Sequence, residues 1–156
     1  VPAQVIKAFQ LKIPTVVLVR HPRDAVTSLI IYNPSISISQ ALKYYIYFYT
    51  HICKYKSGYV IASFDDITNN FREIIKKVNY KFQTNFQMFA VEEINIDQIF
   101  SEISKPDQYD QLKIPRPSSA RKSYKNKIKK ELDSMKFSKL ITKAESIYHE
   151  FLELKD

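Results

Sequence analysis

Residues 15–28 read TVVLVRHPRDAVTS and contain the change from strand to helix that decides the fold class. The run TVVLV has β-branched and apolar residues without polar alternation, which is typical of a parallel strand buried on both faces. Pro22 and Asp24 follow it, and both residue types favour the first turn of a helix. We therefore expect a buried strand over 15–19 that leads directly into a helix beginning at Pro22.

The segments on both sides of this unit also show regular patterns. We expect helices over 2–11, 40–56, 65–78, 94–103, 118–134 and 137–154, a second strand over 59–64, and loops over 79–93 and 104–119. Gly58 would end the long helix as a C′ glycine, and Thr68 or Asn69 would cap the next one. That helix would direct inward Phe71, Ile74, Ile75 and Val78, and the last helix would have an apolar stripe of Leu140, Ala144, Ile147, Phe151 and Leu154. Helices that alternate with strands predict the α/β class. The expected fold is one domain over 1–156, with an incomplete parallel sheet flanked by helices and a helical C-terminal part.

The chain is basic, with 24 Lys and Arg against 16 Asp and Glu and a formal net charge of +8. Such a surface attracts anions, so one hypothesis is a module that binds nucleic acid or another polyanion through residues 116–130. The chain is also rich in Lys, Ile, Asn and Tyr and poor in Gly and Trp, which indicates a general bias of composition. A generic basic surface is therefore the simpler interpretation, and nucleic acid is not the partner we expect.

The few cysteines, histidines and glycines limit which kinds of site the chain can contain. Cys53 is the only cysteine, so no internal disulfide can form, and the three histidines form no Cys/His cluster that would predict a metal site. No apolar run approaches the roughly 18 residues of a membrane span, so we expect a soluble, cytoplasmic protein. Gly58 is the only glycine, whereas average usage would give about ten. The chain therefore contains no glycine-rich loop that would cradle a phosphate.

Arg20 and Ser28 are the candidate site residues. Arg20 directly follows the expected strand, and ligands of open α/β sheets bind at the carboxyl ends of the strands. A guanidinium offers forked donors that suit a phosphate. Ser28 lies eight residues later, about 130° around the helix from its apolar side. We expect the arginine, the serine hydroxyl and the helix dipole to hold one anion.

The pattern Arg20-His21-Pro22 followed by Ser28 resembles the sulfotransferases that use 3′-phosphoadenosine 5′-phosphosulfate. In that family a strand is followed by Arg-x-Pro-x-x-x-x-x-Ser, and the Arg and Ser bind the 3′-phosphate of the cofactor. The preceding text, PAQVIKAFQLKIPTVVLV, is similar to bacterial members of the family. The resemblance covers residues 2 to about 80. It implies a P-loop-type parallel sheet, this cofactor, and transfer of a sulfuryl group to a hydroxyl or amine of an acceptor that the sequence does not identify.

The resemblance also extends to the second strand and to the C-terminal region. YVIASFDDI is similar to the family's second strand, which would place Phe64 near the adenine of the cofactor. PRPSSARKS weakly resembles a basic loop that reaches the 3′-phosphate in the family, and its candidate phosphate ligands are Arg121 and Lys122. The family's Gly-rich loop and catalytic base would precede Val1. We therefore expect a partial sulfotransferase-like domain, the C-terminal part of an enzyme, that has no catalytic residue of its own and is inactive alone.

Each feature of the candidate site has a simpler interpretation. Arg20 and Asp24 would form an ion pair at the start of the helix, and Ser28 would be a solvated helix residue. The strand followed by Arg-x-Pro would then be an ordinary connection between a strand and a helix. We favour the family interpretation because the flanking sequence agrees with it.

Histidines and aromatic residues outside the motif are assigned structural roles. We interpret His21 as a turn residue rather than an acid or base, and His51 and His149 as structural or exposed. The aromatic run YYIYFY over 44–49 would suit stacking with single-stranded nucleic acid, but at helical spacing it is more often part of a core. We therefore expect it to pack inside the protein.

Overall fold

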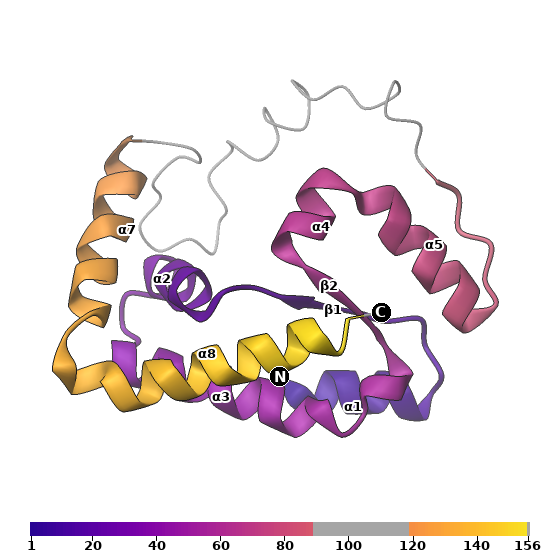
Figure 1. The fold of residues 1–156 in the computed structure, drawn as a ribbon, viewed down its shortest axis with the longest axis horizontal. Coiled ribbons are helices and arrows are strands. Elements are labelled where there is room, and N and C mark those ends of the chain that lie inside the picture. Colours follow the sequence, from indigo (N-terminus) through magenta and orange to yellow (C-terminus); the bar gives the residue numbers. More distant parts are fainter. Residues whose placement is uncertain (89–118, 156) are drawn as a thin grey trace.

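A computed structural model describes residues 1–88 and 119–155. In this part of the chain two parallel strands are surrounded by helices (Figure 1). The elements are α1 (Pro2–Gln10), β1 (Val16–Val19), α2 (Pro22–Tyr32), α3 (Ile38–Cys53), η1 (Lys56–Gly58), β2 (Val60–Ser63), α4 (Phe64–Asn69), α5 (Phe71–Phe82), α7 (Ser119–Leu132), η3 (Met135–Phe137) and α8 (Ser138–Glu153). β1 pairs with β2 in parallel, with Val16 opposite Val60. The described residues are mostly helical and contain a small parallel sheet, which is compatible with the expected α/β class.

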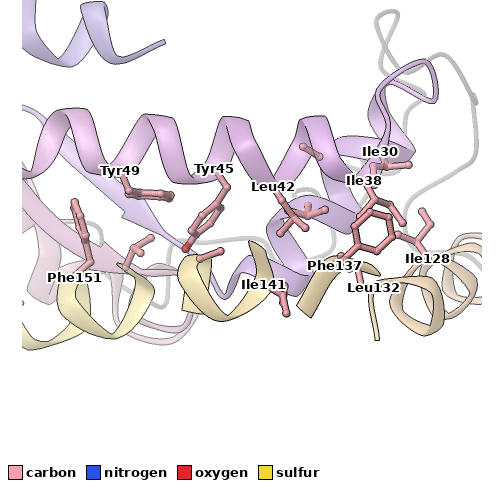
Figure 2. Close-up of a cluster of buried hydrophobic side chains, with 14 of the residues drawn as sticks. Ile30, Ile38, Leu42, Tyr45, Tyr49, Ile128, Leu132, Phe137, Ile141 and Phe151 are labelled. Carbon is pink, nitrogen blue, oxygen red and sulfur yellow. The ribbon is translucent and has the colours of Figure 1, made fainter. Parts of the chain in front are cut away.

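The main core lies between α3, α8 and one face of the sheet. Apolar residues of α3 meet those of α8 along their length, as Figure 2 shows for Leu42, Tyr49, Ile141 and Phe151. Val19 of β1 belongs to the same cluster. Full burial of one large apolar side chain contributes about 1.5 to 3 kcal/mol. Packing of this kind fixes the sheet on the pair of long helices.

The opposite face of β1 is open, so the prediction of a strand buried on both faces is wrong for this structure. Val17 and Val19 are buried, but Val16 and Leu18 are 38% and 41% exposed. Alternate residues of a strand point to opposite faces, and the described helices cover only one face of β1. α5 contacts β2, whose residues are all buried. Local composition predicted the strand correctly, but which of its faces is buried depends on how the helices pack in the tertiary structure.

The prediction that Gly58 ends the long helix is wrong. α3 ends at Cys53 with Lys54 as its C-cap, and Gly58 lies in η1. Its φ is not positive, so glycine is not required there for a left-handed turn. A Cβ atom at Gly58 would lie 1.9 Å from Cδ2 of Phe9. The glycine is needed because the Phe9 ring, which packs on Tyr55, occupies that space.

We expect Gly58→Ala to lower the free energy of unfolding by about 1 to 3 kcal/mol, the usual range for overpacking. Urea denaturation of the two proteins measures this difference. The same substitution in a Phe9→Ala background should cost much less, because the ring that the new methyl group would meet is gone. An equal cost in both backgrounds would show that the contact with Phe9 is not the reason for the glycine.

The expected helix over 65–78 is two helices, and neither Thr68 nor Asn69 caps it. α4 begins at Phe64, and the hydroxyl of Ser63 accepts a hydrogen bond from the N–H of Asp66. The Asp66 carboxylate in turn accepts from the N–H and hydroxyl of Ser63, both at 2.7 Å. This capping box was overlooked because Ser63 and Phe64 read as the end of a strand.

α5 also differs from expectation at both ends. Asn70 is its N-cap, and Phe71 is 42% exposed rather than directed inward. Ile74 and Val78 are buried as expected, but the helix continues to Phe82 instead of giving way to a loop at residue 79. Gln83, with φ of 54°, ends it in the left-handed conformation.

Asp66 also links α4 to the end of α8. Lys155 Nζ donates to both carboxylate oxygens, at 3.0 and 2.8 Å. Burial alone would raise the pKa of Asp66, but the hydrogen bonds from Lys155 and Ser63 outweigh it and lower the pKa to about 2. The folded state therefore binds this proton less readily than the unfolded chain does.

We expect this carboxylate to make stability dependent on pH in the acid range. Its contribution, about 1 kcal/mol after allowance for solvent screening, is fully present above the unfolded pKa of 3.8 and is lost as the pH falls towards 2. Asp66→Asn should remove this dependence, as measured by urea denaturation between pH 2 and 6. The neighbouring exposed Asp65→Asn should retain it. The assignment would be wrong if both variants kept the same pH profile.

The two C-terminal helices appear where the sequence predicted them. α7 spans Ser119–Leu132 and α8 spans Ser138–Glu153, and Ala144 and Phe151 of the expected apolar stripe are buried. The predicted helix over 94–103 and most of the predicted loop over 104–119 lie outside the described residues.

Candidate phosphate-binding site

Arg20 and Ser28 lie together at the carboxyl end of β1. Arg20 directly follows the strand, and α2 begins two residues later at Pro22. Arg20 Nη1 donates a hydrogen bond to Ser28 Oγ at 3.1 Å, and both residues are half-buried. The eight-residue spacing thus brings a guanidinium and a hydroxyl to one place, as expected from the sequence. Both groups can donate to the oxygens of a single anion.

Two buried tyrosines of α3 hold this end of β1. The Tyr45 hydroxyl donates to the carbonyl oxygen of Arg20 at 2.9 Å, and the Tyr49 hydroxyl donates to that of Leu18 at 2.8 Å. Burial raises the pKa of Tyr49 to about 12 and raises that of Tyr45 as well, so both stay neutral donors. The prediction that the aromatic run is core is confirmed for these two. Sequence reasoning missed that their hydroxyls position Arg20.

Phe64 lies against the guanidinium of Arg20. Ser63 pairs with Val19 in the sheet, so the next residue of each strand comes to the same edge. The Arg20 Cζ atom is 4.3 Å from the centroid of the Phe64 ring. A contact of this kind contributes about 0.5 to 1 kcal/mol at an exposed site, and this ring is 40% exposed. Phe64 therefore belongs to the site by position, and its role towards adenine stays a prediction.

α7 adds positive charge to the site. Arg121 is buried and Lys125 is half-buried one helical turn later. Burial lowers the pKa of Lys125, and the positive charges of Arg20 and Arg121 lower it further. These three cations therefore share a region of positive potential that an anion would stabilise. Lys125 was not among the sequence candidates, although its spacing of four residues from Arg121 indicates a shared helix face.

The two α7 residues suggested by the sequence, Arg121 and Lys122, have different positions in the structure. Arg121 contributes to the potential around Arg20 and Lys125, whereas Lys122 lies on an exposed face of the helix. The motif residue Arg121 therefore lies near Arg20, and its role towards the 3′-phosphate stays a prediction. Residues 115–118, which complete the motif, lie outside the described part of the chain.

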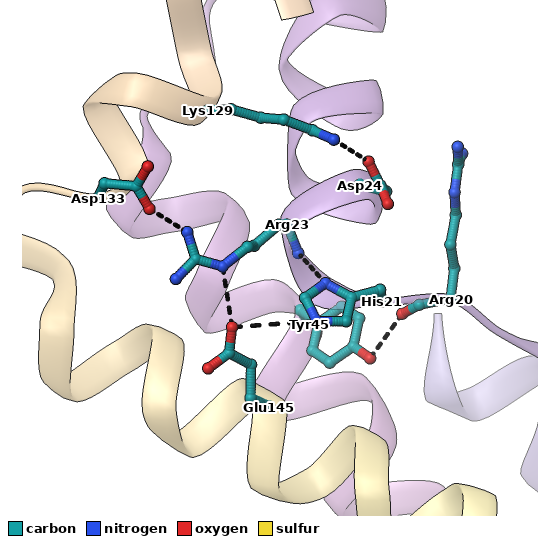
Figure 3. A network of polar contacts seen from close by, with 8 residues as sticks. All are labelled: Arg20, His21, Arg23, Asp24, Tyr45, Lys129, Asp133 and Glu145. Atoms are coloured by element: carbon teal, nitrogen blue, oxygen red, sulfur yellow. Dashed lines mark hydrogen bonds and ion pairs between the residues drawn. The ribbon is translucent and has the colours of Figure 1, made fainter. Parts of the chain in front are cut away.

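The simpler interpretation of Arg20, an ion pair with Asp24, does not describe the structure. Asp24 pairs with Lys129 at 2.6 Å, while the Arg20 guanidinium points away from this network (Figure 3). Burial would raise the pKa of Asp24, but the hydrogen bond from Lys129 outweighs it, and Arg20 contributes only a smaller electrostatic effect. Within the described residues, no carboxylate is close enough to form an ion pair with Arg20.

Arg23 explains how α7 and α8 are held against the start of α2. Its side chain donates to Glu145 of α8 at 2.9 Å and also pairs with Asp133, which follows α7 (Figure 3). These ion pairs raise the pKa of Arg23. Arg23 and Lys129 fix the position of α7, and this position determines where Arg121 and Lys125 lie.

The histidines have structural positions, as expected. His21 is the N-cap of α2, and its Nδ1 accepts a hydrogen bond from the N–H of Arg23 at 3.4 Å. Its ring packs edge-on against Tyr148, with 5.2 Å between centroids. His51 and His149 are both exposed.

Comparison with protein-family models, with curated proteins and with solved structures found no match to this chain. The function of the site is therefore inferred from its side chains and from the sequence pattern that contains them. No helix in the described ranges, 1–88 and 119–155, has both the length and the apolar character needed to cross a membrane.

Proposed function

We propose that Arg20 and Ser28 bind the 3′-phosphate of 3′-phosphoadenosine 5′-phosphosulfate in a sulfotransferase-type enzyme with a P-loop-type sheet. The observation that carries the proposal is the contact between Arg20 Nη1 and Ser28 Oγ at the end of a parallel strand. Ligands bind at this edge in open α/β sheets. A guanidinium without a carboxylate partner in the described residues, beside a hydroxyl, suits a phosphate monoester.

The surrounding residues support a doubly charged ligand rather than a neutral one. The pKa of Lys125 is lowered first by burial and then by the charges of Arg20 and Arg121, which outweigh the opposing effect of Asp24. A phosphate monoester carries a charge of about −1.5 to −2 at pH 7 and relieves this repulsion. The exposed ring of Phe64 beside Arg20 offers a flat apolar surface for the adenine. The side chains present therefore fit the part of the cofactor that the sequence pattern suggests.

The proposed activity of the complete enzyme is transfer of a sulfuryl group from the cofactor to an acceptor hydroxyl or amine. The phosphosulfate supplies the group, the acceptor loses a proton, and adenosine 3′,5′-bisphosphate is released. The residues of this chain would bind and orient the cofactor, which is the main protein contribution to such group transfers. With one glycine, the chain has no glycine-rich loop for the phosphosulfate. We expect it to bind the bisphosphate and to show no transferase activity.

A second candidate function is binding of a polyanion, because α7 exposes a row of lysines. Lys122, Lys127 and Lys130 are exposed on this helix. Lys125 cannot distinguish the two functions, because it lies close enough to Arg20 for the charge of Arg20 to lower its pKa. The three exposed lysines are the better choice for a test, since they do not contribute to the Arg20 site.

Calorimetric titration of the chain with adenosine 3′,5′-bisphosphate tests the proposal. We expect saturable binding with one site per chain, unchanged in the triple variant Lys122→Ala/Lys127→Ala/Lys130→Ala. A single-stranded oligonucleotide serves as the polyanion in a parallel titration at two salt concentrations. Lack of saturable nucleotide binding would contradict the proposal. Nucleotide binding that the triple variant abolishes, with a steep dependence on salt, would instead support a polyanion surface.

A further inference from the structure

A hollow lies at the opposite end of β2 from the phosphate site. It has a volume of about 650 Å³ and is formed by η1, the start of β2, α5 and the C-terminal end of α8. Figure 1 shows α5 and the end of α8 on either side of β2. Leu154 and the exposed ring of Tyr80 contribute apolar surface. The volume lies within the range of pockets that bind small organic molecules.

The charged residues around this hollow are mostly lysines. Lys56, Lys77 and Lys81 line it, with Glu153 as the one acidic residue. Lys77 and Lys81 are four residues apart on α5, so their like charges repel each other. Within residues 1–88 and 119–155, none of the three lysines forms an ion pair.

Other lysines of the protein do form such pairs. Lys76, next to Lys77 on the same helix, contacts Glu73 at 2.6 Å, Lys129 contacts Asp24, and Lys155 contacts Asp66. These three lysines have carboxylate partners, whereas Lys56, Lys77 and Lys81 leave an excess of positive charge beside an apolar hollow. A bound anion would provide the missing countercharge.

We propose that this hollow binds a small organic anion with an apolar body. The acidic head group is held by Lys77 and Lys81, with Lys56 nearby, and the apolar body packs against Leu154 and the ring of Tyr80. Lysine suits this role because its ammonium group moves on a flexible stem and can meet a carboxylate or a sulfonate alike. Apolar contact adds about 25 cal/mol for each Å² removed from water. Because the acidic head group and the apolar body would both make contacts, the hollow should bind an amphiphilic anion more tightly than inorganic phosphate.

This site does not depend on the proposed nucleotide site. The hollow lies where β2 begins, whereas Phe64 and Arg20 lie beyond the ends of β2 and β1. Arg20→Ala should therefore leave binding in the hollow unchanged. Failure of the one proposal would leave the other intact.

Fluorescence titration with 8-anilinonaphthalene-1-sulfonate tests the proposal, since this probe joins a sulfonate to an aromatic body. We expect Lys77→Gln/Lys81→Gln to weaken its binding about tenfold, the effect of two weakened charge contacts. The control variant Lys43→Gln/Lys76→Gln removes the same charge from exposed positions that do not line the hollow, and should change the affinity less than about twofold.

The location of the probe is read independently from amide NMR shifts. Saturating probe should shift the amides of residues 56–61, 77–81 and 153–154 in the wild-type protein. Equal affinity in the two double variants, or shifts confined to the exposed face of β1 around Leu18, would overturn the proposal.

Discussion

Replacing Arg20 by alanine is expected to weaken the binding of adenosine 3′,5′-bisphosphate about 30- to 100-fold. The substitution removes the forked cation that donates to Ser28 and faces the Phe64 ring. A charge-assisted contact of this type contributes about 2 to 2.7 kcal/mol, which corresponds to that loss of affinity. Calorimetric titration of both proteins under the same salt conditions measures it.

Graded variants of the site give this prediction its controls. Arg20→Lys keeps the charge but loses the fork, so we expect a loss smaller than that of alanine. Ser28→Ala removes one neutral hydrogen bond, worth about 1 kcal/mol or roughly fivefold in affinity. The loss of affinity should therefore be largest for Arg20→Ala and smaller for Arg20→Lys. If the alanine variant bound the nucleotide as tightly as the wild type, the phosphate would not lie at Arg20.

Phe151→Ala is expected to lower the free energy of unfolding by about 3 to 5 kcal/mol, the usual cost of deleting a buried phenyl ring. Phe151 is 1% exposed, and its ring packs edge-on against Tyr49 with 5.1 Å between centroids. It joins α8 to α3 at one end of the core cluster (Figure 2). Such a loss is a large share of the stability of a small domain, and urea denaturation will measure it.

The same substitution should also loosen the site at a distance. Tyr49 holds the carbonyl of Leu18, close to Arg20, so disorder of its ring reaches the end of β1. Leu152, which is only partly buried, provides the control, and Leu152→Ala should cost less than half as much. A cost below about 1 kcal/mol for Phe151→Ala would show that α8 does not pack on α3 in this way.

The local part of the fold was predictable from the sequence. The strand over 16–19, the helix that starts at Pro22 and the meeting of Arg20 with Ser28 all follow from patterns within about fifteen residues. Over such a distance, the geometry of the strand and helix fixes where side chains lie. The sequence pattern also predicted the parallel pairing of β1 with β2 and, apart from the division of 65–78 into two helices, the order of the described helices.

Features that depend on distant residues were not predictable. Gly58 is required because of Phe9, from a different helix, rather than because of its own backbone. The simpler interpretation paired Asp24 with Arg20, but Asp24 pairs with Lys129 from a distant helix. The contribution of Lys125 to the site depends on the packing of α7, which periodicity alone does not reveal. The open face of β1 likewise reflects which elements cover the sheet, a property of the whole fold.

The role of Arg20 as the ligand of a 3′-phosphate is tested most directly by a cycle of four titrations. Wild type and Arg20→Ala are each titrated with adenosine 3′,5′-bisphosphate and with adenosine 5′-monophosphate, which lacks the 3′-phosphate. We predict that the wild type prefers the bisphosphate and that Arg20→Ala binds both nucleotides with similar affinity. A preference that survives unchanged in Arg20→Ala would contradict the proposed site.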